Sequence, residues 1–410
     1  MKKHPAAIAM FVVLLISYIL NSIDRNLFSI LTVEVRKQMS LSLPEVGLAA
    51  TVFTLGMGVA ALPTGKLLTS VSRKSIVLLG LFIFSVATWL TAYSRGLPDL
   101  LAYRFISGLG EAMQVTALIA IGASYFHTRP ALVTGMISFA YGIGAVVGPM
   151  IAAVLLKAYD WKMPFIVCGA VGIIMMLMIA MWIRPWFSES KINEEHTRSD
   201  RDNHAAPGSN DTTWSLATIL LGLASVCTGV AVFGFFGLYP LYLRSVIEFS
   251  PAQAGLVMSA IGIGGFLSPF GGWLGDRVGS HKVLFVALPL TALSGGIPFT
   301  GLLGQSVTLY VAFAFIYGFA VVGMIYANMS AIIINSMSPT KTSLASGLFI
   351  TSYYIPAAFA GYLMGRLKEA SSWTTAGILQ SSGFAAVALI LIIVARTTRK
   401  PAMLPSGATL

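Results

Sequence analysis

Long apolar runs separated by short polar connections dominate this sequence. A membrane-spanning helix needs about 20 predominantly apolar residues, and twelve runs along the chain meet that requirement. The pattern therefore predicts an all-α membrane protein whose twelve transmembrane helices lie near residues 7–32, 44–66, 75–94, 98–123, 131–157, 163–184, 214–241, 252–272, 283–303, 307–335, 344–365 and 375–395.

One connection is much longer and more polar than the others. It is rich in Asn, Ser and Asp and divides the spans into two groups of six. The predicted organisation is an N-terminal six-helix bundle over 1–184, a linker over 185–213, a C-terminal six-helix bundle over 214–396 and a tail over 397–410.

The distribution of basic residues predicts the orientation. Lys and Arg are enriched in loops on the cytoplasmic side of a membrane. The loops on the side of the termini and the linker carry 16 of them, against 8 on the other side. We therefore expect a multi-pass protein of the cell inner membrane with both termini and the linker in the cytoplasm.

The composition excludes several classes of protein. Of 410 residues, 56% are hydrophobic and 10% are charged, whereas a soluble domain carries about 25% charged residues. A soluble enzyme is thus excluded. The net charge of +11 reflects the loop bias, so we expect the lipid bilayer and no nucleic acid as a partner, and a monomer. Neither a metal-ligand spacing of Cys and His nor a P-loop occurs in the sequence, so no metal, cofactor or ATP use is expected.

Two connections occupy equivalent places in the two groups of spans. The chain reads GKLLTSVSRK over 65–74 and GWLGDRVGSHK over 272–282, about half the chain apart. This placement indicates a duplicated six-span unit. Such repeats build transporters whose substrate site lies between the halves, near the middle of the membrane.

The second of these stretches resembles the cytoplasmic signature of the major facilitator superfamily. The resemblance implies that Asp276 and Arg277, with Arg73 of the first copy, form a gate that holds the halves closed on the cytoplasmic side. A helix-capping role for Asp276 is the compatible alternative. The first copy departs from the pattern, because Thr69 stands at the Asp position and Ser72 at the Gly position.

Four charged residues lie well inside predicted spans, away from the span ends: Asp24, Arg25, Arg104 and Glu111. A charge inside a bilayer costs at least about 2.5–3.5 kcal/mol, so such residues are normally functional. Arg104 and Glu111 are two helical turns apart and share one face. Burial favours a neutral carboxyl group whereas a nearby Arg favours the charged form, so we expect these acids to exchange protons near physiological pH. A buried structural ion network is the alternative.

Two motifs around these charges carry a further resemblance. The R-x-x-x-G-x-G at Arg104 resembles a second superfamily signature, and the Asp-Arg pair of the first span together with it looks like the anion–cation symporter branch. The Spinster-like branch has similar motifs. The resemblance implies that Arg25 binds an acidic group of the substrate. Asp24 and Glu111 would take and release protons, and Arg104 would hold Glu111 or couple it to the cavity.

Further polar residues extend this candidate site. Asn21 and Gln114 lie about one turn from Arg25 and Glu111 and are predicted to contact the substrate with Arg25. The second half has no charge at the matching positions, since Ala314 and Val321 align with Arg104 and Glu111. It offers polar side chains instead, of which Tyr353 and Asn328 are the preferred substrate contacts among Tyr239, Tyr242, Tyr317, Tyr326, Asn328, Tyr353 and Tyr354.

The sequence favours a secondary active transporter that carries a small organic anion, a carboxylate or sugar acid, in symport with protons by alternating access. The proton gradient drives it, and sodium is the alternative coupling ion. A glycine-proline pattern in the fifth span, from Gly135 to Ala153, resembles a motif of exporters. Proton-driven export of drugs or amphiphilic lipids is therefore the second interpretation, with generic helix packing as the plain explanation of that pattern.

Overall fold

The structure, a computed structural model, describes residues 5–126, 130–190, 214–337 and 341–398. Within these residues it contains helices and no strand. Twelve helical segments of the described chain are long and apolar enough to cross a membrane, and each overlaps one predicted span. The predicted all-α fold with twelve transmembrane helices is confirmed. The predicted linker from residue 191 on and the predicted tail from residue 399 on lie outside the described residues.

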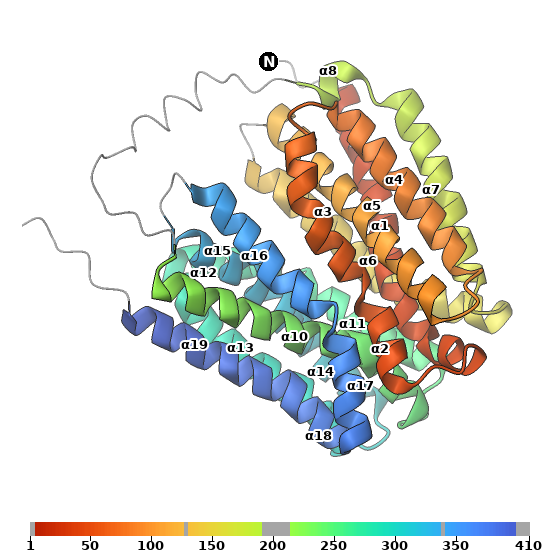
Figure 1. Cartoon of the computed structure of the whole chain (residues 1–410), viewed down its shortest axis with the longest axis vertical. Coiled ribbons are helices and arrows are strands. Elements are labelled where there is room, and N and C mark those ends of the chain that lie inside the picture. Colours follow the sequence, from red (N-terminus) through yellow and green to blue (C-terminus); the bar gives the residue numbers. More distant parts are fainter. Residues whose placement is uncertain (1–4, 127–129, 191–213, 338–340, 399–410) are drawn as a thin grey trace, which may run out of the picture.

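The N-terminal half is coloured red to yellow-green in Figure 1 and consists of α1 (Pro5–Gln38), α2 (Leu43–Thr51), α3 (Phe53–Leu67), α4 (Arg73–Thr91), α5 (Leu97–Tyr125), α6 (Pro130–Ala158), α7 (Met163–Trp182) and α8 (Pro185–Ser188). The C-terminal half is coloured green to blue and consists of α10 (Leu216–Ser245), α11 (Pro251–Gly265), α12 (Ser268–Val278), α13 (Ser280–Gly296), η1 (Ile297–Thr300), α14 (Val307–Gly318), η2 (Phe319–Ile325), α15 (Tyr326–Ile334), α16 (Thr342–Ala357), α17 (Ala360–Ala370), α18 (Trp373–Gly377), η4 (Ile378–Gly383) and α19 (Phe384–Thr398).

Some helices run past their predicted ends. α1 continues to Gln38 although the predicted span stops at residue 32, and α12 continues to Val278 although the predicted span stops at residue 272. Both extensions contain charged residues, which end an apolar run but not a helix. A hydropathy pattern therefore locates the apolar part of a helix and not the terminus of that helix.

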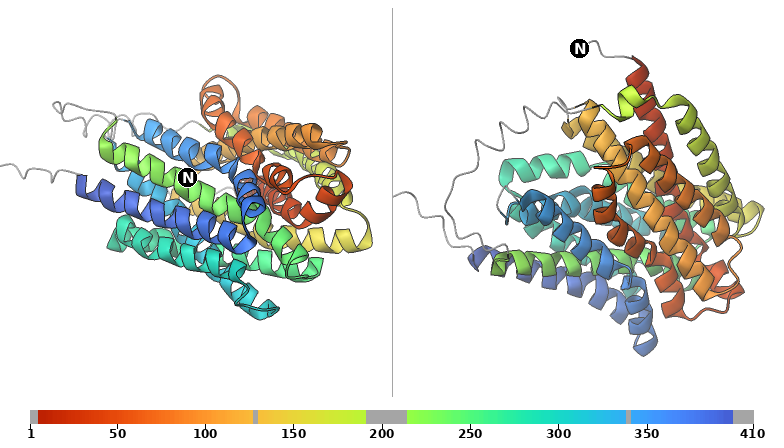
Figure 2. Two further views of the ribbon diagram at one scale, coloured as in Figure 1. Left: turned by 60° about the horizontal axis from the view of Figure 1, so that its bottom comes forward. Right: turned by 45° about the horizontal axis from the view of Figure 1, so that its top comes forward.

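The two halves meet at one end of the molecule and diverge at the other (Figures 1 and 2). We call the end that holds α8 and the start of α10 the linker end, and the opposite one the far end. At the far end α2 packs against α17. The backbone of Gly361 lies so close to the carbonyl group of Gly47 that a Cβ atom at Gly361 would clash with it. The hydroxyl of Thr51 also donates to the carbonyl oxygen of Ala358 at 2.7 Å. The described structure is therefore closed at the far end.

An ion pair also joins the halves at the far end. Arg244 of α10 donates to both carboxylate oxygens of Glu34 on α1, each at 2.6 Å, and to the carbonyl oxygen of Ile30 at 2.8 Å. The two side chains are only partly exposed, and a two-pronged Arg–carboxylate pair is the strongest common geometry. We refer to Glu34 and Arg244 as the far-end latch.

Removal of the far-end latch should populate a state that is open at the far end. A well-formed pair of this kind contributes about 1 kcal/mol, so Arg244→Gln should raise the open fraction several-fold. The measurement is a spin-label distance between Lys37→Cys and Ala370→Cys, made without the native cysteines Cys168 and Cys227, and we expect longer distances.

Arg366 provides the control for the latch variant. It pairs with Glu369 at 3.3 Å inside α17 and is largely exposed, so Arg366→Gln should leave the distances unchanged. Identical distance distributions for Arg244→Gln and Arg366→Gln would show that the far-end latch does not hold this conformation.

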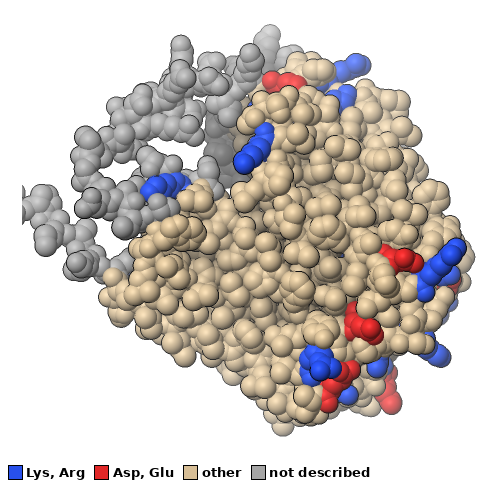
Figure 3. Space-filling model, in the orientation of Figure 1, with Lys and Arg blue, Asp and Glu red and all other residues tan. Residues whose placement is uncertain are grey.

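The surface agrees with a protein that is embedded in lipid. Charged side chains gather toward the two ends of the face seen in Figure 3, and a broad band without them lies between. Large apolar side chains are exposed on many helices, among them Phe82, Met181 and Ile390. Together with the twelve candidate spans, this makes the chain a multi-pass membrane protein.

Candidate functional site

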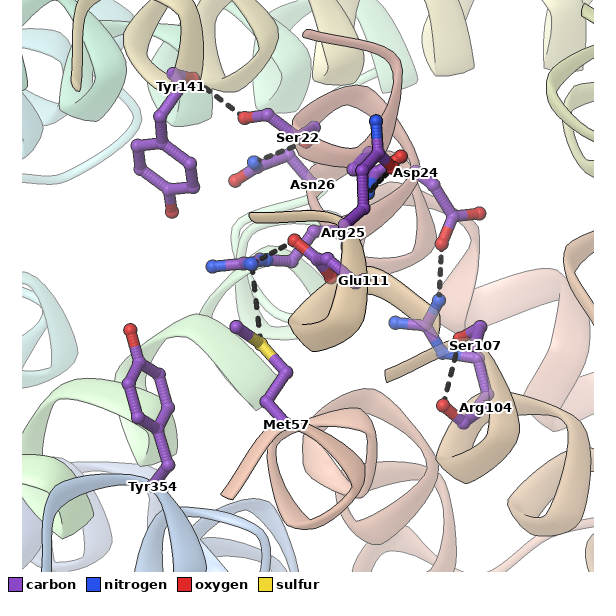
Figure 4. Close-up of polar contacts among 12 residues, drawn as sticks. Ser22, Asp24, Arg25, Asn26, Met57, Arg104, Ser107, Glu111, Tyr141 and Tyr354 are labelled. Atoms are coloured by element: carbon purple, nitrogen blue, oxygen red, sulfur yellow. Dashed lines mark hydrogen bonds and ion pairs between the residues drawn. The ribbon is translucent and has the colours of Figure 1, made fainter. Parts of the chain in front are cut away.

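Two buried ion pairs join α1 to α5 (Figure 4). Arg25 pairs with Glu111, and Nη1 of Arg104 lies 3.1 Å from Oδ2 of Asp24. No side chain of the four is more than 8% exposed. Of the two roles predicted for Arg104, holding Glu111 is wrong, because each arginine reaches the carboxylate of the other helix that faces it; coupling Glu111 to the cavity stays a prediction. The structure thus brings all four predicted charges together, in two separate pairs.

Aromatic rings take the place of water around both guanidinium groups. The ring of Phe53 lies 5.4 Å from Arg25 and 5.2 Å from Arg104, so one side chain contacts both cations. Tyr141 lies 5.2 Å from Arg25, and Phe28 lies 4.6 Å from Arg104. Rings at such distances attract cations through their quadrupoles. The two ion pairs are therefore neighbours across Phe53.

Close helix packing creates this arrangement. Adjacent residues of a helix point about 100° apart, so Asp24 and Arg25 reach different neighbours from one turn of α1. Gly108 of α5 lies so close to the backbone of Phe53 that a Cβ atom there would clash with it. This contact brings α3, and with it Phe53, against the two ion pairs. Gly144 of α6 is packed in the same way against Ser22 of α1. Gly144 and Gly148 of the fifth-span pattern thus serve helix packing against α1, whereas Gly135 has open space beside it.

A cavity of about 240 Å³ lies between the two halves beside Arg25. Within the described residues, Arg25 is the one charged side chain that lines it, and the residues around it are Tyr18, Arg25, Val115, Ile119, Ile137, Ser138, Tyr141, Val232, Phe233, Phe236, Gly265, Ser268, Val321, Val322, Tyr326, Tyr353 and Tyr354. Glu111, Asp24 and Arg104 do not line the cavity. Arg25 therefore links the cavity to the acid with which it pairs.

Two predicted substrate contacts lie behind the cavity. Nδ2 of Asn21 donates to Oε1 of Gln114 at 2.6 Å, and Nε2 of Gln114 donates to the hydroxyl of Ser17 at 2.8 Å. Both amides are fully buried and absent from the cavity lining. Asn21 and Gln114 hold α1 against α5 in this structure, and they do not meet the cavity as predicted.

The two preferred contacts of the second half have different positions. Tyr353 lines the cavity. Asn328 does not, because its amide donates to the carbonyl oxygens of Gly271 at 3.0 Å and Met324 at 2.8 Å. It joins α12 to α15 at a place where Gly275 has no room for a Cβ. The amide donors of a polar residue in a span can thus both be taken up by backbone carbonyl groups.

The sequence-based prediction missed two tyrosines of the first half. Tyr18 and Tyr141 both line the cavity. Tyr18 stands seven residues before Arg25, hence on the same face of α1, and this spacing was a usable signal. Tyr141 comes from α6, and no sequence feature places it beside α1. By contrast, Tyr239, Tyr242 and Tyr317 pack inside the second half and do not line the cavity.

The predicted gate residues stay within their own halves. Asp276 and Arg277 are exposed, and the guanidinium of Arg277 lies 5.3 Å from the ring of Trp273. Nη1 of Arg73 donates to the carbonyl oxygens of Ser188 at 3.4 Å and Ser190 at 3.0 Å. Over the ranges that the structure describes, no ion pair joins the halves at the linker end, in keeping with their divergence there.

The departure of the first copy from the signature has a backbone explanation. Gly279 adopts a φ of 96°, which favours glycine. Ser72 in the first copy has a φ of −59° and caps α4 with its side chain. The carboxylate of Glu189 accepts the backbone N–H groups of Arg73 and Lys74, each at 3.1 Å. The first copy thus forms a different turn, in which glycine is not needed.

The family of the chain follows from its sequence match. The profile of the Major Facilitator Superfamily matches residues 14–360 and, in a second match, residues 221–409. The chain belongs to the Major Facilitator Superfamily. It is a membrane transporter and not an enzyme.

Relatives within the superfamily carry different substrates by name. The probable L-galactonate transporter of Escherichia coli K12 is 28% identical over 39% of this chain and 35% of its own length, so the matched part spans about a third of that protein. The 4-hydroxybenzoate transporter PcaK of Pseudomonas putida is 24% identical over 74% of this chain and 73% of its own. The multidrug resistance protein MdtL of Shewanella oneidensis is 23% identical over 88% and 89%.

A solved structure agrees with the fold. The inward-facing, occupied form of a bacterial homologue of the human lysosomal transporter Spinster superimposes with a TM-score of 0.71, over 96% of both chains at 17% identity. At that identity the likeness concerns the fold alone.

Proposed function

We propose that this protein is a proton-coupled symporter that carries a small organic anion across the inner membrane by alternating access. One observation carries the proposal: the single charged side chain of the described cavity lining, Arg25, is paired with a carboxylate that lies outside the cavity, Glu111. The carboxylate of a substrate and that of Glu111 therefore compete for one guanidinium group.

This competition couples the proton to the anion. A buried arginine without an anionic partner is strongly unfavourable. Protonation of Glu111 removes the partner of Arg25, so an anion from the cavity must replace it. Release of the anion on the other side requires Glu111 to lose its proton and pair with Arg25 again. The cycle moves one with the other because neither exchange is favourable alone.

Asp24 remains a second protonatable group in the proposal. Its partner Arg104 contacts Phe53, which also contacts Arg25. A change of charge at Asp24 would act through these side chains and not on the anion directly. The proton gradient is the proposed energy source, and no cofactor is needed for such a cycle.

The orientation completes the proposal. With both termini and the linker in the cytoplasm, the linker end faces inward, and the described structure corresponds to an inward-facing state. The gate role of Asp276, Arg277 and Arg73 would then belong to the opposite state, in which the linker end closes. A monomer suffices, since the cavity is formed within one chain.

Proton-driven export of apolar compounds is the second candidate. The cavity lining consists largely of aromatic and aliphatic side chains, and a multidrug resistance protein aligns with 88% of the chain. Export of a neutral or cationic compound would not require the charge of Arg25. The requirement for that charge therefore separates the two candidates.

The test is uptake into proteoliposomes with an imposed inward proton gradient, with labelled 4-hydroxybenzoate and L-galactonate as probes. Arg25→Ala should lose at least about 90% of the accumulation, since no other cation lines the described cavity. Arg366→Gln, an exposed arginine of α17, should transport normally. A sodium gradient without a pH gradient tests the other coupling ion. Anion uptake that survives Arg25→Ala would refute the proposal.

A further inference from the structure

We propose that the cavity selects a monocarboxylate with a flat aromatic body, and that it rejects polyhydroxylated sugar acids and dicarboxylates. This inference rests on the proposed function, transport of an organic anion, and narrows its substrate. It follows from three properties of the cavity: its charge, its hydrogen-bonding groups and its rings.

The charge of the cavity accommodates one carboxylate. Of its lining residues in the described structure, Arg25 alone is charged. The other buried arginine, Arg104, is paired with Asp24 behind Phe53 and does not reach the cavity. A second carboxylate on the ligand would have to be buried without a cation, which is strongly unfavourable. A dicarboxylate is therefore a poor ligand.

The described cavity lining has no amide or carboxylate side chain, the groups that can bind two neighbouring hydroxyls of a sugar at once. Sugar acids need several donors and acceptors along their length, and a buried hydroxyl without a partner is unfavourable. The amides that could serve, those of Asn21, Gln114 and Asn328, are bonded elsewhere and do not line the cavity. The lining instead offers seven single hydroxyl groups, from five tyrosines and two serines, and five of these seven sit at the edge of an aromatic ring.

The rings form a continuous surface, which we call the aromatic wall: Phe233, Tyr326, Tyr353 and Tyr354. The ring centroids of Tyr353 and Tyr354 are 5.2 Å apart, those of Tyr326 and Tyr353 are 5.6 Å apart, and those of Phe233 and Tyr354 are 5.9 Å apart. Aromatic pairs at such distances prefer offset or edge-to-face contacts. A flat ring that enters the cavity would meet this surface with the same geometry.

The guanidinium of Arg25 lies where the carboxylate of such a ligand would bind. In Figure 4 its free end points toward the space between Tyr141 and Tyr354. Its position is fixed by Tyr141 at 5.2 Å, Phe53 at 5.4 Å and the sulfur of Met57 at 3.3 Å. The cavity volume of about 240 Å³ is small for a binding pocket. A single ring with one carboxylate therefore matches both ends of the site.

The experiment measures equilibrium binding to the purified full-length transporter by competition with labelled benzoate. Benzoate and nicotinate test the proposed class, D-gluconate and succinate test the rejected classes, and benzamide keeps the ring without the charge. We expect benzoate to bind at least about tenfold more tightly than each of the last three. Tyr354→Leu should weaken benzoate binding by about threefold to tenfold, and Tyr354→Phe, which keeps the ring, should restore it.

The outcomes separate this inference from the proposed function. Tighter or equal binding of D-gluconate or succinate would overturn the inference and leave anion transport intact, as would equal binding of benzoate by the Leu and Phe variants of Tyr354. If neither labelled benzoate nor any unlabelled anion binds to the protein, while benzamide and apolar cations do, the proposed function itself fails. Tight benzoate binding that is lost in Tyr354→Leu and restored in Tyr354→Phe supports both.

Discussion

Replacement of Glu111 by Gln is expected to abolish uphill accumulation of the anion while exchange across the membrane continues. Gln has nearly the shape of a protonated Glu and cannot release a proton, so Arg25 stays available to the substrate at every pH. In proteoliposomes with an inward proton gradient, accumulation should fall at least about tenfold, to the level of equilibration. Counterflow of labelled against unlabelled substrate should persist, and its rate should depend less on pH than that of the native protein.

The matched control changes an exposed carboxylate. Glu369 pairs with Arg366 on the surface of α17, so Glu369→Gln should accumulate substrate as the native protein does. Concentrative uptake by Glu111→Gln would remove Glu111 from the coupling mechanism and leave Asp24 as the acid to examine.

The second large effect concerns folding stability. Asp24→Leu is expected to lower the free energy of unfolding by about 3–5 kcal/mol, because it leaves Arg104 buried without its carboxylate. Arg104 is 1% exposed, and its Nε and Nη2 atoms already lack hydrogen-bond partners in the structure. Thermal unfolding of the purified protein in detergent is the measurement.

The double variant distinguishes lost charge pairing from lost packing. Asp24→Leu with Arg104→Met removes both charges and should recover most of the stability, since apolar replacement of a buried pair is often neutral. Glu34→Leu at the partly exposed far-end latch should lower the stability by only about 1 kcal/mol. A double variant as unstable as Asp24→Leu would mean that the packing of these side chains matters more than their charges.

The sequence alone was enough to predict the twelve spans and the four charges inside them. It was not enough to predict which of these charges pair with each other. Apolar runs and charges in spans 1 and 4 are local features, which a sequence displays directly. Whether Arg104 meets Asp24 or Glu111 depends on the rotation of α5 against α1, and this is set by glycine contacts such as that of Gly108 with Phe53. Local spacing could not provide that rotation.

The polar residues show the same limit. Asn21, Gln114 and Asn328 are polar residues in apolar helices, as is Tyr353, but only Tyr353 lines the cavity. Neighbouring groups can take up both donors of an amide, as the carbonyl groups of Gly271 and Met324 do for Nδ2 of Asn328. Which polar side chains remain available is therefore decided by tertiary contacts. The alignment of the two halves was informative at one position, because the uncharged Val321 that aligns with Glu111 lines the cavity.

The continuous segment from α2 to α3 has a mechanical consequence. Thr51 at the end of α2 is bonded to the opposite half. Two residues later, Phe53 touches both arginines and packs with its ring 6.2 Å from that of Phe233 in the opposite half. When the far end opens, α2 must leave α17, and the ring of Phe53 that contacts both cations moves with it. The far-end contact and the binding site thus move as one rigid segment. No further element is needed to transmit the opening of the far end to the two arginines.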